Sequence, residues 1–289
     1  MRGMAVRDGD GWAVCARGHR HWGVHGASGL LAVHHGPDGT PYVLLQKRAL
    51  WSHHGGTWGL PGGATDSHED AITGALREAW EEAALDATGL RVFGVYVDDH
   101  GGWSFQTVLA QAAGLLEATP NAESVELRWV PADEITSRPL HPGFAETWPA
   151  VRQALTPVVV VLDAANIVGA RAEHGWWRDR AGAARRLLGE VGRLAREGLR
   201  RPVDGAPELA VWFPRMTVVV EGAAREVEPV DGVGVVAAPG SGDDAIVEEV
   251  RRARPWERVV VVTADRGLRE RVGALGASVA GPKWLLSQI

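Results

Sequence analysis

The sequence predicts an α/β protein with two domains. Its 289 residues are enough for two domains of ordinary size. The first half mixes strand-like apolar runs with a helical pattern, whereas the second half alternates strands and helices. A stretch with four prolines, Pro139–Pro157, separates the two patterns. We therefore expect domains at 1–149 and 158–289, joined by a linker at 150–157.

The two halves also differ in charge. Residues 1–149 contain 10 basic and 18 acidic residues, a net charge of −8, whereas residues 150–289 contain 20 and 18, a net charge of +2. The total of −6 argues against a protein that coats nucleic acid. No stretch approaches the ~18 uninterrupted apolar residues of a membrane span, and the N-terminus lacks a long apolar run. With a single cysteine, Cys15, we expect a cytoplasmic protein.

Strands and one helix are expected in the first half. The runs Leu30–Val33 and Tyr42–Gln46 flank a turn rich in glycine, proline and aspartate. Ser67, with Asp70 three residues later, predicts the start of a helix that continues to Ala83. Further strands are expected at Leu90–Val97, Ser104–Ala110 and Val125–Val130. In the proline-rich stretch between the halves, a short helix is expected between Trp148 and Leu155.

The second half predicts a mainly parallel sheet. Val158–Leu162 is a continuous β-branched run, and a long helix is expected from Arg178 to Glu197. Further buried strands are expected at Val218–Val220, Gly234–Ala237 and Val259–Val262, and helices at Asp244–Arg252 and Gly267–Ala274. Strands that alternate with helices favour parallel pairing.

Three glutamates form the strongest chemical pattern. Glu78, Glu81 and Glu82 stand at i, i+3 and i+4, so a helix places all three on one face. Since like charges at this spacing repel, we expect a divalent cation to hold them, and hard oxygen ligands favour Mg²⁺ or Mn²⁺. The apolar positions of the helix are expected on its other side, leaving the acidic face to line a cleft. The alternative is a solvated acidic face in which Arg77 pairs with a neighbour.

These residues resemble the Nudix box, G-x5-E-x7-R-E-U-x-E-E-x-G-U, where U is aliphatic. The matching positions are Gly63, Glu69, Arg77, Glu78, Ala79, Glu81, Glu82, Ala84 and Leu85. Ala84 replaces the last glycine of the box, for which we expect a slight backbone adjustment. The resemblance covers roughly residues 24–149. It implies an α/β/α sandwich with a mixed sheet, and hydrolysis of a nucleoside diphosphate linked to another group, X.

The resemblance also implies roles for individual residues. Glu78 and Glu82 would be the main ligands of Mg²⁺ (or Mn²⁺), assisted by Glu81 and by the backbone at Gly63. Glu69 and Arg77 would pair and brace the glycine-rich loop against the helix. Glu82, or a later carboxylate, would orient or deprotonate the attacking water. The candidates for that later carboxylate are Glu123 and Glu126, which precede a predicted strand.

Histidines suggest two weaker sites. Cys15, His19, His21 and His25 carry thiolate and imidazole groups that bind zinc, although their spacing does not match a standard zinc finger. The alternative is a set of surface or hydrogen-bonded histidines. His53-His54 lies beside the glycine-rich stretch, where it would contact a substrate phosphate or simply belong to a solvated loop.

The second domain places acidic residues at predicted strand ends. Asp163 follows the first strand, Asp243-Asp244 follow a glycine-rich turn, and Asp265 follows the strand at Val259–Val262. Because the carboxyl ends of parallel strands meet at one edge, these acids are expected to converge on a divalent metal. The alternative is that each aspartate caps a helix.

This set resembles a PIN-like nuclease domain of the NYN type over roughly residues 157–289. The resemblance implies that Asp163, Asp244 and Asp265 hold Mg²⁺ or Mn²⁺, supported by Asn166 and Asp243, and that the metal activates water against RNA. The family often has Gly-Tyr where this chain has Ala164-Ala165. Arg178, Arg180, Arg185 and Arg186 would follow a phosphate backbone or form a solvated helix face, and Trp176-Trp177 would stack on bases or pack in a core.

We therefore expect a Mg²⁺-dependent Nudix pyrophosphohydrolase joined to a metal-dependent ribonuclease domain. In a second interpretation both domains act on RNA and process its 5′ end. In a third, the C-terminal domain is an inactive RNA-binding or regulatory module.

Overall fold

The computed structural model describes residues 7–171, 179–201 and 206–289. The chain divides into two compact units, which we describe separately. Unit 1 contains Met1–Leu155 and Pro207–Ala210, and unit 2 contains Thr156–Ala206 and Val211–Ile289. Among the described residues, no helix has the length and apolarity needed to cross a membrane.

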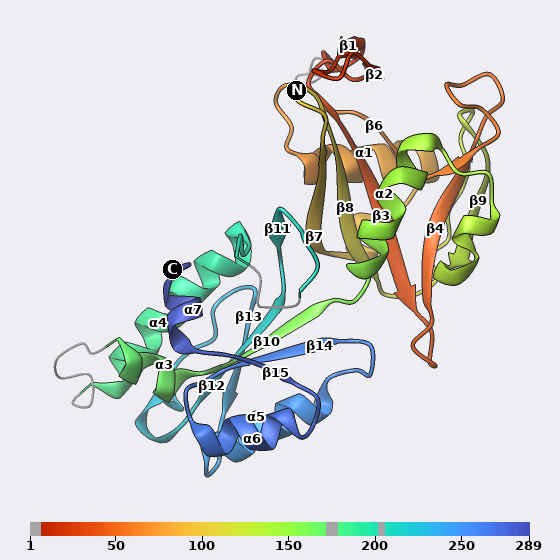
Figure 1. The fold of residues 1–289 in the computed structure, drawn as a ribbon. Helices are drawn as coiled ribbons and strands as arrows, with labels where there is room; N and C mark the ends of the chain where they lie inside the picture. The colour runs from red at the N-terminus through yellow and green to blue at the C-terminus, as the bar shows by residue number, and fades with distance from the viewer. Residues whose placement is uncertain (1–6, 172–178, 202–205) are drawn as a thin grey trace. The chain divides into compact units, whose positions relative to one another are not determined.

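Unit 1 is built on a mixed sheet (Figure 1). Its strands are β3 (Ala27–His35), β4 (Pro41–Arg48), β5 (Trp58–Gly59), β6 (Gly62–Ala64), β7 (Leu90–Asp99), β8 (Ser104–Ala112) and β9 (Ser124–Pro131). The order is β7-β8-β3-β4-β5, with β6 also paired to β3 and β9 to β4. β3 and β8 run parallel, whereas β3 and β4 form the predicted antiparallel hairpin. The expected mixed sheet is confirmed.

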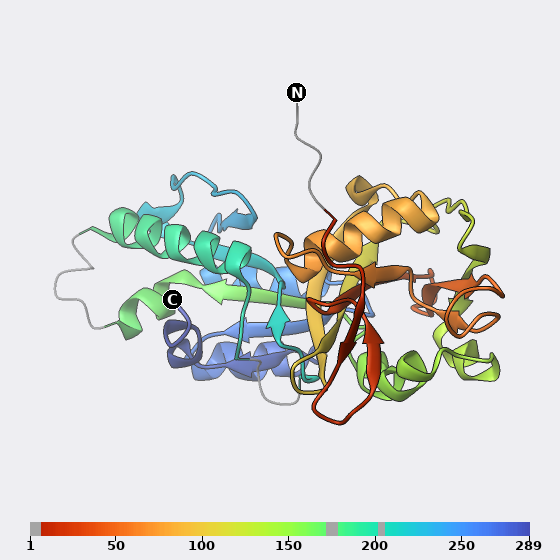
Figure 2. The ribbon, with the colours of Figure 1, turned by 90° about the horizontal axis from the view of Figure 1, so that it is seen from above.

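Two helices cover opposite faces of this sheet, as Figures 1 and 2 show: α1 (Ala71–Ala83) and α2 (Pro142–Gln153). Because both faces are covered, nearly all of β3 is buried. The predicted cap of α1 was wrong: Asp70, not Ser67, accepts a hydrogen bond from the Thr73 amide at 2.8 Å. Short 3-10 helices lie at Ala87–Gly89 and Ala132–Ser137.

The first half of the stretch expected to be a linker is helical. α2 begins at Pro142, whose missing amide hydrogen is not needed in the first turn of a helix. It then continues through Pro149 to Gln153, because Phe144 and Trp148 bury one face of the helix. The helix is therefore longer than predicted and overlaps the first half of 150–157.

A small hairpin precedes the sheet of unit 1. Its strands, β1 (Trp12–Val14) and β2 (Arg20–Trp22), pair with each other and form a separate two-stranded sheet.

Unit 2 contains a five-stranded parallel sheet, as the alternating pattern predicted. Its strands are β10 (Val158–Asp163), β12 (Arg215–Val220), β13 (Val233–Ala237), β14 (Arg258–Val262) and β15 (Ser278–Ala280), in the order β13-β12-β10-β14-β15. Its helices are α3 (Ala164–Ala170), α4 (Arg180–Glu197), α5 (Gly242–Arg252), α6 (Arg266–Gly273) and α7 (Pro282–Leu286). α5 and α6 lie on one face, and α3 and α4 on the other. A two-residue strand, β11 (Val211–Trp212), and a 3-10 helix, Gly222–Ala224, complete the unit.

Candidate active site

The three glutamates of α1 do not share one environment. Glu82 is only 4 % exposed, because it stands on the same side of the helix as Ala75 and Ala79, which pack against the sheet. The expected separation of an acidic face from an apolar face was therefore wrong for Glu82. Its carboxylate is held instead by the backbone: the Gly62 amide donates to Oε2 at 2.8 Å.

Gly63 lies directly against the second carboxylate of the cluster. A Cβ atom at this position of β6 would lie 2.8 Å from the Glu78 carboxylate carbon. Glycine is therefore the residue that lets the Glu78 carboxylate lie against the strand. The glycine turn and the helix thus bring Gly62, Gly63, Glu78 and Glu82 together.

Arg77 links the helix to the loop before it. Its guanidinium donates two hydrogen bonds to the Glu69 carboxylate, at 2.7 and 2.8 Å, and a third to the Ala64 carbonyl at 3.0 Å. The predicted pairing of Glu69 with Arg77 is confirmed. These hydrogen bonds lower the pKa of Glu69. The same guanidinium also reaches Glu78 at 2.6 Å.

Burial raises the pKa values of Glu78 and Glu82. Burial, aided by the charges of Glu78 and Glu123, raises the pKa of Glu82 to about 7, against the hydrogen bond from Gly62. Burial also raises the pKa of Glu78, although Arg77 opposes this shift. Charge that is destabilised in this way would be relieved by a cation placed between the two carboxylates.

The structure distinguishes the two later carboxylates. Glu123 lies near enough to Glu82 for its charge to raise the pKa of Glu82. The loop that carries it is tied to the end of α1, because the Asn121 amide bonds to the Glu82 carbonyl at 3.3 Å. Glu126 instead lies within β9 and pairs with Arg128 at 2.5 Å. Of the two candidates, Glu123 is therefore the one brought to Glu82.

Several neighbours of the cluster were not predicted. Arg7 pairs with Glu81, and the charge of Arg48 opposes the rise in the pKa of Glu82. His53 and His54 gather with His141, with ring nitrogens within 4.8 Å of one another. Burial, with the nearby charges of His54 and Arg48, lowers the pKa of His141 to about 4. Only the adjacent histidines 53 and 54 stood out in the sequence, since His141 comes from the start of α2.

Unit 2 brings acids together where its strand order reverses. Asp163 ends β10 and Asp265 follows the adjacent β14, and β10 and β14 are the strands between which the order changes direction. The Thr263 hydroxyl donates to the Asp163 carboxylate at 2.8 Å, and the Asn166 side chain accepts from the Ala264 amide at 2.8 Å. This is the crevice in which open α/β sheets bind ligands.

The alternative interpretation of these aspartates as helix caps also applies. Asp163 caps α3 through the Asn166 amide at 3.0 Å, and Asp265 caps α6 through the Leu268 amide at 2.7 Å. Each carboxylate therefore combines a capping hydrogen bond with a place in the crevice.

From the sequence, Asp244 was expected to be a metal ligand and Asp243 to support it, but the structure brings Asp243 nearer to the other acids. Asp244 is 72 % exposed and bonds to Arg271 at 2.6 Å. Asp243 instead lies close enough to Asp163 for its charge to raise the pKa of Asp163, and burial, with the charge of Asp265, raises the pKa of Asp243 itself. Consecutive helical residues point about 100° apart, so only one of the two can face the sheet edge.

Glu221 was missed by the sequence analysis. It follows β12, its charge raises the pKa values of Asp163 and Asp243, and it accepts from the Gly242 amide at 2.8 Å. Its position directly after a buried strand was the signal available.

The structure describes only some of the residues that were expected to contact RNA. Arg180, Arg185 and Arg186 are exposed on α4. Trp176, Trp177 and Arg178 lie outside the described residues.

Comparison with known proteins identifies the first unit. The NUDIX domain family matches residues 27–152. A Mycobacterium tuberculosis protein named putative 8-oxo-dGTP diphosphatase 3 is 54 % identical over 161 residues, which cover 54 % of this chain and 73 % of that protein. A Bifidobacterium longum nucleoside triphosphate pyrophosphatase/Nudix hydrolase fusion protein is 44 % identical over 146 residues, 49 % of this chain and 30 % of the fusion.

A solved structure gives a similar match. The Nudix hydrolase RenU from M. smegmatis is 49 % identical, with a TM-score of 0.48, and the match covers 50 % of this chain and 94 % of that structure. Together with the family and the Mycobacterium tuberculosis relative, the carboxylates gathered on α1 lead to one conclusion: the chain belongs to the Nudix hydrolase family and is an enzyme that acts on phosphoric anhydrides.

Proposed function

We propose that unit 1 is a Mg²⁺-dependent pyrophosphohydrolase that cleaves a nucleoside diphosphate linked to another group. The observation that carries the proposal is the pair of the partly buried Glu78 and the buried Glu82, held against Gly62 and Gly63 at the spacing of the Nudix box. The first substrate to test is an oxidised purine nucleoside triphosphate, because the Mycobacterium tuberculosis relative is named for 8-oxo-dGTP.

The donors around these carboxylates suit a hard cation. Glu78 and Glu82 offer oxygen ligands whose ionised forms are destabilised by burial, with Glu81 and the Gly63 backbone beside them. A bound Mg²⁺ would neutralise charge on the phosphate oxygens of the substrate. Glu69 and Arg77 fix the loop relative to α1, which keeps Gly63 and Glu78 in contact.

The proton acceptor is assigned to the buried end of the cluster. Glu82 or Glu123 would take the proton of the attacking water, since their mutual repulsion favours protonation of one of them. Glu126 is not proposed for this role, because its carboxylate pairs with Arg128.

The test is a hydrolysis screen with matched variants. We expect E82Q to lower Mg²⁺-dependent turnover at least ~10²-fold, the scale of losing one key electrostatic group. E126Q should retain turnover, because the Glu126 carboxylate that it removes lies on β9 and pairs with Arg128. The screen compares an oxidised purine triphosphate with its unmodified form, a nucleoside diphosphate sugar and a dinucleoside polyphosphate. Near-normal turnover by folded E82Q would reject the mechanism, and a preference for another substrate would reject only the oxidised purine.

We further propose that unit 2 is a PIN-like metal-dependent ribonuclease domain. The specific observation is the set of acids at the strand-order reversal, Asp163, Asp243, Asp265 and Glu221, with Asn166 beside them. Exposed arginines on α4 would attract the phosphate backbone. The alternatives are a unit that processes the 5′ end of RNA together with unit 1, and an inactive RNA-binding module.

RNA cleavage separates these alternatives. Labelled RNA is incubated with the full chain and Mn²⁺. We expect D163N to abolish internal cleavage. We expect D244N to retain it, because the Asp244 carboxylate pairs with Arg271. Loss of a 5′ nucleotide that depends on both Glu82 and Asp163 would favour joint processing. Binding without cleavage would favour the inactive module, and equal cleavage by both variants would reject the site.

A further inference from the structure

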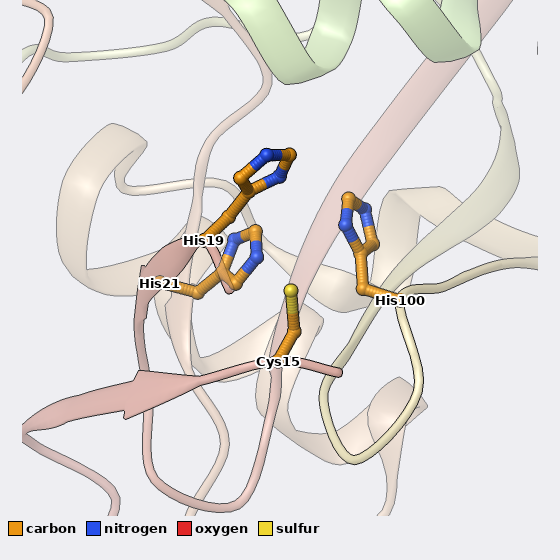
Figure 3. A group of neighbouring side chains, drawn as sticks. All are labelled: Cys15, His19, His21 and His100. Atoms are coloured by element: carbon orange, nitrogen blue, oxygen red, sulfur yellow. The ribbon is translucent and has the colours of Figure 1, made fainter. Parts of the chain in front are cut away.

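A second group of metal-ligating side chains lies away from the glutamates. Cys15, His19 and His21 come from the β1–β2 hairpin, and His100 from the turn between β7 and β8 (Figure 3). One ligand atom from each of the four lies within 4.8 Å of the others. His25, which the sequence had grouped with the hairpin, lies apart from this cluster, 3.9 Å from Asp8.

The hydrogen bonding of His100 prepares it to bind a metal. Its Nε2 lies 2.9 Å from a carboxylate oxygen of Asp98. Because a carboxylate accepts, Nε2 carries the proton, and this leaves a lone pair on Nδ1. That atom is buried and has no hydrogen-bond partner among the described residues. An imidazole that donates one nitrogen to a carboxylate and leaves the other open is the arrangement of zinc-binding histidines.

His21 and Cys15 are also poised as ligands. The His21 ring stacks on Trp103 with centroids 4.0 Å apart, and its buried Nε2 has no hydrogen-bond partner in the described part of the chain. The Cys15 side chain is buried at 4 % exposure. Two buried, unpartnered imidazole nitrogens beside a buried thiol are costly unless something occupies the space between them.

We propose that Cys15, His19, His21 and His100 bind a structural Zn²⁺ ion. Sulfur and imidazole are the ligands that zinc prefers, and four protein ligands complete its tetrahedron. Tetrahedral ligands at normal bond lengths lie about 3.3–3.6 Å apart. The 4.8 Å limit of this cluster therefore leaves only small side-chain rotations to close the site.

The ion explains how the hairpin is held in place. An isolated two-stranded hairpin is marginally stable, and β1–β2 is a sheet of its own. Backbone contacts already bring it to the β7–β8 turn: Ala16 donates to the Gly101 carbonyl at 2.7 Å, and Trp103 to the Gly23 carbonyl at 2.9 Å. The zinc ion would close this junction and fix Trp12 of the hairpin, whose ring lies 5.4 Å from that of His53.

Cobalt substitution tests the site in the full chain. Since Cys15 is the only cysteine, a sulfur-to-cobalt charge-transfer band can come from this site alone. Excess Mg²⁺ keeps cobalt from the glutamates of α1. We expect one equivalent of Co²⁺ to give that band with tetrahedral visible absorption, and one equivalent of Zn²⁺ to displace it. Stoichiometric Co²⁺ without the band would overturn the proposal.

Variants identify the remaining ligands. C15S should abolish the band, H100Q should weaken Zn²⁺ affinity at least ~10²-fold, and D98N should weaken it ~10-fold through the hydrogen bond to His100. H25Q is the matched control and should bind as the wild type does. Circular dichroism and hydrolysis with Mg²⁺ check that each variant is folded. An unchanged affinity in folded H100Q would show that the cluster is not the site.

Discussion

Glu82 is a buried carboxylate whose ionisation opposes the stability of the fold. The residue is almost fully buried, and its single backbone hydrogen bond does not compensate for the loss of water around the carboxylate. A side chain with this environment favours its protonated form until a cation or substrate arrives. A buried carboxylate that suits cation binding therefore lowers the free energy of unfolding when no cation is bound.

The first prediction follows from the pKa of Glu82, which burial raises from its ordinary value of 4.5 to about 7. In metal-free protein, protonated Glu82 contributes to the free energy of unfolding, because its pKa is higher in the folded state than in the unfolded state. This contribution is fully present below about pH 4.5 and is lost as the pH rises through 7. E82Q has no such titration, so it should become more stable than the wild type by up to about 3 kcal/mol at pH 8 and gain little at pH 5. Urea unfolding between pH 5 and 8 in a chelator measures the difference, with E126Q as the control. Parallel pH curves for E82Q and the wild type would contradict the cause assigned to this shift.

At the scale of a single element, the end of α1 carries a strained residue. Ala84 stands at φ 51° and ψ 30°, the left-handed conformation, and its amide bonds to the Trp80 carbonyl at 2.9 Å. This is the position at which the Nudix box has glycine. The family's glycine is thus explained by the turn that ends the helix, since glycine adopts this conformation without a Cβ clash.

The second prediction is that A84G stabilises the protein. Relief of the left-handed strain contributes about 1–2 kcal/mol, and the extra freedom of glycine in the unfolded chain removes about 0.4–1 kcal/mol of this. We expect a net gain of about 0.5–1 kcal/mol in metal-free thermal or urea unfolding. A83G, at the last residue of α1, is the control and should instead destabilise the protein. A loss of stability in A84G would show that Ala84 is not strained.

Local patterns predicted most elements but not their partners. Periodicity placed α1, the β3–β4 hairpin and the parallel strands of unit 2, because these patterns reflect burial of one face or both. It placed only the C-terminal part of α2, because the buried aromatic side chains that extend this helix back to Pro142 outweigh its prolines. It also could not find Arg7, His100 or Glu221, which join their sites through pairings between distant parts of the chain. The box residues were found because they lie within one helix and the loop before it.

At the scale of the whole molecule, the chain forms two compact units. Each unit has its own sheet and its own cluster of carboxylates. The chain also returns once from the second unit to the first: Pro207–Ala210 belongs to unit 1, where the Ala210 amide donates to the Val95 carbonyl at 2.8 Å. Cutting the chain near Pro157 would separate this segment from its partner, so the independence of the units is best tested in the full chain.

The third prediction is that Mn²⁺ stabilises the two units separately. A ligand that binds only the folded state stabilises it by RT ln(1 + [L]/Kd), about 2.7 kcal/mol at a hundredfold excess over Kd. We expect two calorimetric transitions, both raised by Mn²⁺. E82Q should remove the shift of one transition, and the double variant D163N/D265N the shift of the other. Asparagine keeps the helix caps of α3 and α6, so the double variant removes charge without removing a cap.

A single transition that both variants change alike would show that the units do not unfold independently. A Mn²⁺ shift retained in the double variant would reject the acids of unit 2 as a metal site.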